Sequence, residues 1–263
     1  MALGHLLLMA IKYLLLGFGV PLGLVLFLTY LNRNTDAMLD GSVGWQWEVY
    51  LGWLGIIIHE LSHLLLALFF GHKVTEYKLL VLPKDVRSTE NGTVRLGYVN
   101  HQWNPHSLYQ QLGNAFIGTA PVYGSTLAIY CVSRFLAPEW YQNLTTFAHQ
   151  VINLETPTWN LLWATGISSQ GEKIRVIIAV LLIMSITIGG FALSSADLAS
   201  CVTAFGELAL ISFILIFVGS LLGGNVQVAA VTQTIAQFSV SALSFSFLVS
   251  IMVNVIIRIL AIL

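Results

Sequence analysis

Residues 56–66 read IIIHELSHLLL, a His-Glu-x-x-His motif inside a run that is otherwise almost wholly apolar. On a helix, His59 and His63 lie on one face, where both imidazoles can bind a single metal ion. Glu60 lies beside that face and can reach a water molecule at the metal without being a ligand. A bland alternative is a polar seam, with the two histidines hydrogen-bonded between packed helices. Ionisable side chains are costly inside a bilayer, so the motif favours a functional site.

The composition of the whole chain is that of an integral membrane protein. Of the 263 residues, 57% are hydrophobic and 9% are charged, and the mean hydropathy is +0.82. Soluble domains usually contain about 25% charged residues. The net charge of −1 gives no indication of nucleic-acid binding, so we expect no nucleic-acid partner. Cys131 and Cys201 lie in apolar segments and cannot supply a disulfide framework or a cysteine-type zinc site.

The apolar segments predict an α-helical polytopic membrane protein with a single membrane-embedded domain over residues 1–263. Each segment is long enough to cross a hydrocarbon layer of about 30 Å. The polar residues 32–44 predict a solvated loop, and 139–153 predict a partly helical segment within a longer polar connection. We expect about six transmembrane helices, at residues 5–31, 47–70, 107–136, 173–193, 197–222 and 227–260.

Residues 72–105 differ from the rest of the chain. They contain five of the eleven basic residues, with valine, threonine and tyrosine in short alternating runs. Residues 77–82 predict a strand, and Asn91-Gly92 between residues 86–90 and 93–99 is a strong hairpin signal. We therefore expect a small β-sheet or hairpin after the second span. Its basic residues place it on the cytoplasmic side, and an even number of spans places both termini there too.

The metal motif needs a third ligand, because a catalytic zinc ion usually has three protein ligands and one open position. Outside the motif, Asp197 and Glu207 are the acids within the expected bundle. Asp197 lies in a Ser-Ser-x-Asp turn at the start of a helix, where its carboxylate can act as an N-terminal cap. This role is compatible with metal binding, because a capping carboxylate has a second oxygen that can bind the metal. We predict Zn²⁺ bound by His59, His63 and Asp197. Glu207 is either the alternative ligand or the partner of Lys12, which otherwise extends toward the membrane interface.

The motif and its surroundings resemble the site-2 protease family of intramembrane zinc metallopeptidases. The similarity covers residues 50–125 and includes the motif, the spacing of Ala67, Gly71 and Val74 after it, and the strand region that follows. An Asp-Gly third-ligand motif, common in the family, does not occur late in this chain. The Ser-Ser-x-Asp turn is more similar to the corresponding element of divergent bacterial members. The resemblance implies a multi-pass protein of the bacterial cytoplasmic membrane.

These residues and the resemblance predict a zinc metalloendopeptidase that hydrolyses peptide bonds of transmembrane protein substrates, in or near the lipid bilayer. A zinc ion would polarise the scissile carbonyl and activate water, and Glu60 would act as the general base. The edge of the small sheet would hold an unwound substrate segment by strand addition. Asn114, in the polar half of the third span, is a candidate donor to the oxyanion.

Two other functions are compatible with histidines and acids inside a membrane. One is a metal-ion or proton transporter, and the other is a scaffold that binds membrane partners without cleaving them. Transport pathways usually place polar groups on several helices, whereas here they gather around one motif and one later aspartate. A protease should hold about one tight zinc ion per chain and a carrier should bind metal weakly. A scaffold has no need of a general base at Glu60.

Overall fold

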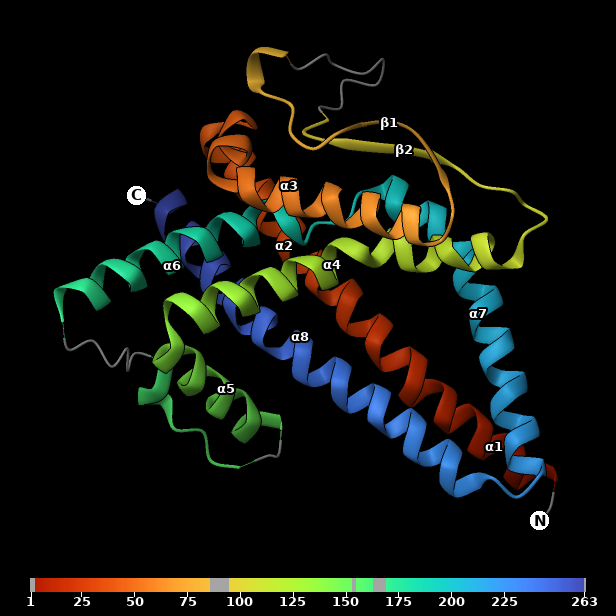
Figure 1. Ribbon diagram of the computed structural model, residues 1–263. Coiled ribbons are helices and arrows are strands. Elements are labelled where there is room, and N and C mark those ends of the chain that lie inside the picture. Colours follow the sequence, from red (N-terminus) through yellow and green to blue (C-terminus); the bar gives the residue numbers. More distant parts are fainter. Residues whose placement is uncertain (1–2, 86–94, 153–154, 163–168, 263) are drawn as a thin grey trace.

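The computed structural model describes residues 3–85, 95–152, 155–162 and 169–262 and is predominantly helical (Figure 1). Within these residues, six segments are long and apolar enough to cross a membrane, which confirms the predicted α-helical polytopic membrane fold. The segments are Gly4–Gly41, Glu48–Phe69, Leu108–Leu136, Gln170–Gly190, Ser195–Leu221 and Asn225–Leu260.

The first long segment is built from three consecutive elements. They are α1 (Leu3–Leu14), a π-helical turn (Leu15–Gly19) and α2 (Val20–Val43). The other helices are α3 (Gln46–Phe69), α4 (Leu108–Leu136), α5 (Pro138–Ile152), α6 (Gln170–Gly190), α7 (Ser195–Leu221) and α8 (Asn225–Ile262). Short 3-10 turns cover Pro83–Asp85 and Trp159–Leu162. The predicted helix within the polar connection is α5.

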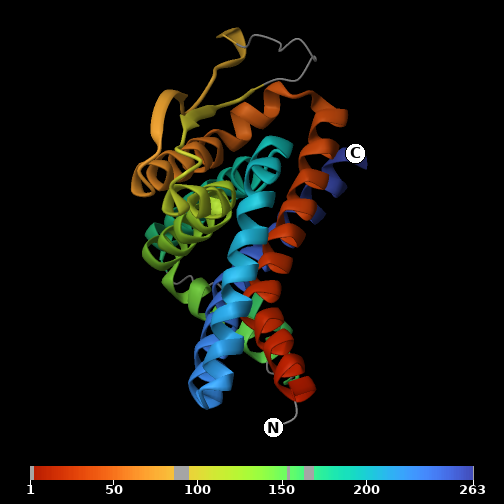
Figure 2. The same ribbon diagram turned by 90° about the vertical axis from the view of Figure 1, so that its right-hand side faces the viewer.

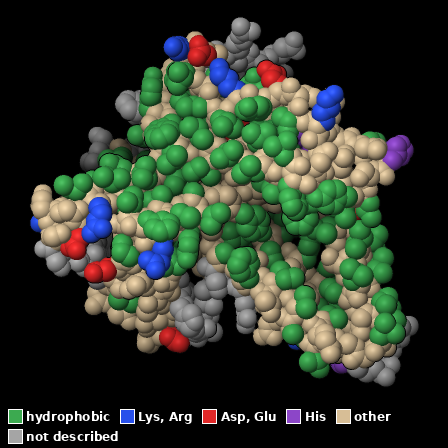
Figure 3. All heavy atoms as spheres, in the orientation of Figure 1, with side chains coloured by type: hydrophobic (Ala, Val, Ile, Leu, Met, Phe, Trp, Pro, Cys, Tyr) green, Lys and Arg blue, Asp and Glu red, His purple; other side chains and the backbone are tan. Residues whose placement is uncertain are grey.

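The surface of the bundle is that of a protein surrounded by lipid. Leu8, Leu127, Leu181 and Leu215 are 68, 62, 61 and 67% exposed, and they belong to four different helices. Figure 3 shows hydrophobic side chains across one broad face, with charged side chains gathered over the sheet and near the ends of α5 and α6. An apolar belt between charged ends is expected of a membrane-spanning bundle, because charged groups are costly in the hydrocarbon layer.

Residues 32–44 are helical up to Val43, so the prediction of a solvated loop is wrong. Buried polar side chains of this stretch contact α8. Asn32 Nδ2 donates to Ser250 Oγ at 3.1 Å, and Asn254 Nδ2 donates to Thr35 Oγ1 at 2.8 Å. Because these amide donors are paired between two helices, polarity here does not mark a turn.

The two termini lie at opposite ends of the molecule (Figures 1 and 2), so the prediction that both lie on the side of the sheet is wrong. α2 and α8 pack along each other, and α1 begins at the end where α8 also begins. α7 starts beyond the end of α6 and leads toward α1, against which it packs. The chain therefore changes direction between α6 and α7, and these two helices do not pack on each other as an antiparallel hairpin.

The predicted β-structure after the second span is a two-stranded antiparallel sheet. β1 (Lys73–Lys78) pairs with β2 (Tyr98–Gln102), with Lys73 opposite Gln102 and Lys78 opposite Tyr98. β1 begins earlier than the predicted strand at 77–82, because Gly71 at φ +70° ends α3 and the chain reverses there at once. The predicted hairpin turn at Asn91-Gly92 lies outside the described residues.

Candidate metal centre

His59, His63 and Asp197 come together where α3 meets the start of α7. The Nε2 atom of His63 lies 3.3 Å from Oδ1 of Asp197, and Nε2 of His59 lies 3.7 Å from Oδ2. The two Nε2 atoms are 3.2 Å apart. One potential ligand atom from each residue lies within 4.8 Å of the others, and both histidines are buried. The three predicted ligands therefore form one compact group.

Backbone carbonyls orient both imidazole rings. Nδ1 of His59 lies 3.2 Å from the carbonyl oxygen of Gly190, and Nδ1 of His63 lies 2.8 Å from that of Ile117. A carbonyl only accepts hydrogen bonds, so Nδ1 donates in each contact. In a neutral ring this leaves the Nε2 lone pair free to bind a metal ion. Histidine ligands of metals usually donate their second N–H in this way, which fixes the tautomer and the ring plane.

Close packing of α3 on α6 brings the Gly190 carbonyl to His59. A Cβ atom added at Gly55 would lie 2.6 Å from the carbonyl oxygens of Ser185 and Ile186. One added at Gly52 would lie 2.9 Å from the backbone nitrogen of Gly189. Small residues at a helix interface allow the two backbones to approach closely in a membrane. The glycines of α3 and α6 therefore set the position of the Gly190 carbonyl relative to His59.

Asp197 is held by a capping box at the start of α7. The hydroxyl of Ser194 accepts from the Asp197 backbone N–H at 3.1 Å, and Asp197 Oδ2 accepts from the Ser194 N–H at 2.6 Å. Ser194 is thus the N-cap residue and Asp197 the third residue of the helix. Gly118 of α4 makes room for this turn, because an added Cβ would lie 2.7 Å from the Asp197 carbonyl oxygen. The predicted capping role and the approach to the histidines occur together.

Glu207 lies away from the histidines. It lies ten residues beyond Asp197, about 15 Å along α7. Its carboxylate accepts a hydrogen bond from the Gln111 side chain of α4. Lys12 is exposed on α1, and within the described part of the chain it forms no ion pair with Glu207. The geometry therefore favours Asp197 over Glu207 as the third ligand, and the Lys12–Glu207 pair predicted as an alternative is not formed.

Two other residues were predicted to act at the site, Glu60 and Asn114. Glu60 follows His59 on α3 and is half-buried, outside the three-residue group. The backbone at Gly97, just before β2, passes directly over its side chain. Asn114 is buried in α4, and its Oδ1 atom has no hydrogen-bond partner among the described residues.

A second histidine pair, which the sequence did not indicate, joins the sheet to the helices. His72 Nδ1 lies 2.9 Å from His101 Nδ1, and His72 Nε2 lies 2.8 Å from the carbonyl oxygen of Gln110 in α4. The ring of Trp103 stacks on that of His72 with centroids 5.9 Å apart. Because the two histidines are far apart in sequence and have no motif spacing, only the folded chain shows the pair.

This pair predicts a loss of stability in mild acid. Burial and the neighbouring His72 lower the pKa of His101 from its ordinary value of 6.5 to about 4. Between these values the unfolded chain binds a proton that the folded chain does not, so the free energy of unfolding falls as pH decreases. Thermal unfolding of the detergent-solubilised protein should show a lower Tm at pH 4.5 than at pH 7, and His101→Gln should flatten this dependence. An equally steep profile in the variant would assign the effect to other groups.

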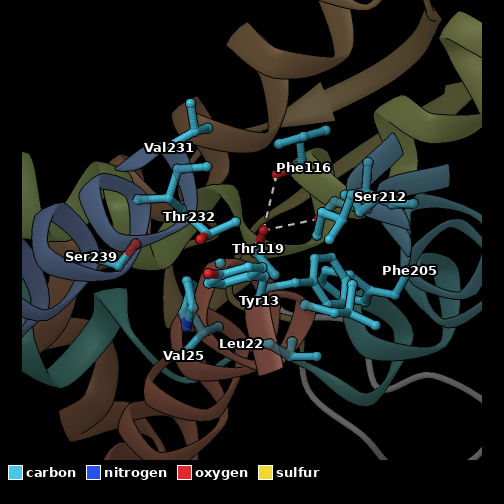
Figure 4. A pocket seen from close by; sticks show the side chains of 18 of the residues that line it. Tyr13, Leu22, Val25, Phe116, Thr119, Phe205, Ser212, Val231, Thr232 and Ser239 are labelled. Carbon is cyan, nitrogen blue, oxygen red and sulfur yellow. Dashed lines mark hydrogen bonds between the residues drawn. The ribbon is translucent and has the colours of Figure 1, made fainter. Parts of the chain in front are cut away.

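A large apolar cavity is separate from the metal centre. It has a volume of about 670 Å³ and lies between α1, the π-helical turn, α2, α4, α7 and α8 (Figure 4). None of the three candidate ligands lines it, and neither does Glu60. The hydroxyls of Thr119 and Thr232, which face it, donate to carbonyl oxygens of their own helices. A peptide backbone would find few hydrogen-bond partners in this cavity. It is therefore a poorer candidate for binding a peptide substrate than the group of residues on α3.

Comparisons with family models, curated proteins and solved structures gave no match. The function is therefore inferred from the geometry of the site. The described residues form a multi-pass helical membrane protein in which two oriented histidines and a capped aspartate share one buried centre.

Proposed function

We propose that this chain is an intramembrane zinc metalloprotease of the site-2 protease type, acting in a bacterial cytoplasmic membrane. Its substrates would be transmembrane proteins, cleaved in or near the bilayer. The observation that supports this most is the convergence of His59, His63 and Asp197 beside Glu60 within a helical bundle. A site of this kind is costly in a membrane, and a general base next to it favours hydrolysis over passive binding.

The donor set fits a zinc ion. Two neutral imidazole nitrogens and one carboxylate are a common ligand set for catalytic zinc, with a fourth position left open. The orientation of both Nε2 atoms toward Asp197 needs no rearrangement of the ring tautomers. When bound, zinc would supply Lewis-acid polarisation of the scissile carbonyl and activation of water.

The chain's own residues would handle the proton and the substrate. Glu60 would accept a proton from the attacking water and deliver it to the departing amine. Substrate helices hide their peptide groups, so the cleaved segment must unwind first. Each strand of the two-stranded sheet has one edge without a strand partner among the described residues, and β2 begins next to Glu60. Strand addition at such an edge would hold the unwound segment close to the catalytic residue.

Comparative membrane proteomics of cells with the native protein and with Glu60→Ala tests this function. We expect at least one membrane protein, or a fragment of one, to accumulate only in the variant. Purified native protein should contain about one tightly bound zinc ion per chain. Identical proteomes, together with weak and reversible metal binding, would favour a metal-ion transporter instead.

A further inference from the structure

The backbone that leads into β2 is fixed directly over Glu60. The carbonyl oxygen of Leu96 accepts a hydrogen bond of 2.7 Å from the backbone N–H of Val81. β2 then begins at Tyr98 and pairs with β1. Gly97 lies between these two attachments, so its backbone is held on both sides. The segment 96–98 therefore lies against one side of the site and is attached to the sheet.

The space around Gly97 leaves no room for a side chain. A Cβ atom added there would lie 2.6 Å from Cγ of Glu60, 3.0 Å from Oε1 and 3.1 Å from Cδ. Real Cβ atoms almost never approach a heavy atom closer than 3.0 Å. The φ angle of Gly97 is outside the left-handed region, so its backbone conformation is open to other residues. All three nearest atoms belong to Glu60, and a side chain here would therefore displace Glu60 first.

We propose that Gly97 is a positioning residue for Glu60. Its missing side chain lets the backbone close against Cγ, Cδ and Oε1 of Glu60, which restricts the rotamers open to that side chain. The Glu60 carboxylate is thereby held in the conformation that the structure shows. A general base works best when its geometry is set before the substrate arrives. This role rests on the proposed function, but the contact that it needs can be tested without any cleavage.

The first test is a double-mutant cycle in thermal stability, measured on the full chain in detergent. Gly97→Ala should lower Tm by about 2 °C or more, because the added methyl group overpacks against Glu60. In a Glu60→Ala background the three clashing atoms are gone, so the same substitution should cause no decrease. A role of Gly97 in the sheet alone would give equal decreases in both backgrounds.

The second test is cleavage of fluorescently labelled casein, an unfolded probe. Gly97→Ala should lower kcat roughly 10- to 100-fold, with KM and zinc content unchanged, because a small displacement of a catalytic group has a large effect on rate. Gly23→Ala is the matched control, since a Cβ atom there has nothing within 4 Å. It should cleave casein at the native rate.

The two tests separate this inference from the proposed function. If Glu60→Gln cleaves casein at the native rate, proteolysis through Glu60 is wrong, while the stability cycle still reports on the contact. If Glu60→Gln is inactive but Gly97→Ala has native kcat, the positioning role is overturned. Equal losses of Tm in the two backgrounds overturn it as well.

Discussion

Glu60→Gln is expected to lower the rate of casein cleavage by about 10²- to 10⁴-fold while leaving one zinc ion per chain. Glutamine has nearly the same shape as glutamate, but its amide cannot accept a proton from water at neutral pH. Glu60 lies outside the group formed by His59, His63 and Asp197, so its replacement removes no metal ligand. Loss of activity with retained metal is what distinguishes a general base from a ligand.

The measurement pairs a cleavage assay with metal analysis of the same purified sample. Glu76→Gln is a suitable control, because this glutamate lies exposed on β1 and accepts a hydrogen bond from Tyr98. The control should cleave casein at close to the native rate. Native activity in the Glu60 variant would refute the proposed mechanism, and loss of zinc from it would make Glu60 a ligand.

Asp197→Asn is expected to lower zinc affinity by at least about 100-fold and to abolish cleavage. Replacing a group that merely supports a ligand typically costs 10- to 100-fold in affinity, so loss of a charged ligand should cost at least as much. Asparagine can still accept the hydrogen bond from the Ser194 N–H, which keeps the start of α7 capped. Competition with a chelator of known affinity, followed by metal analysis, measures the change.

Ser194→Ala is the matched control for Asp197. It removes the hydroxyl that accepts from the Asp197 backbone but retains the backbone N–H that binds the carboxylate. We expect a stability loss of about 1 kcal/mol from the missing cap and a retained zinc ion. Retention of tight zinc in Asp197→Asn, with its loss in Glu207→Gln, would instead make Glu207 the third ligand.

The helical framework was predictable because the local sequence is enough to define a membrane-spanning helix. Such a segment must be apolar and must satisfy its backbone hydrogen bonds within itself. The segment predicted at 47–70 is α3 (Gln46–Phe69), and the one at 107–136 is α4 (Leu108–Leu136). In each case an apolar run is enough to define the helix.

The errors occurred where partners come from distant parts of the chain. Residues 32–44 appear loop-like by polarity, but Arg258 and Asn254 of α8 bind Asn34 and Thr35. β1 begins just after the turn at Gly71, and its pairing with β2 depends on which segment returns to it. Polarity along a sequence does not reveal whether a side chain meets water or another helix.

The sequence by itself determined the membrane-spanning class of this protein and the His59-Glu60-x-x-His63 motif, because helical periodicity places residues four apart on one face. Only the tertiary structure decided which acid faces the histidines and which carbonyls orient their rings. Asp197 reaches them because α6 packs through its glycines on α3 and ends at Gly190, and because Gly118 admits the first turn of α7. These are contacts between helices, and helix–helix contacts depend on the packing of whole surfaces, which no local pattern encodes.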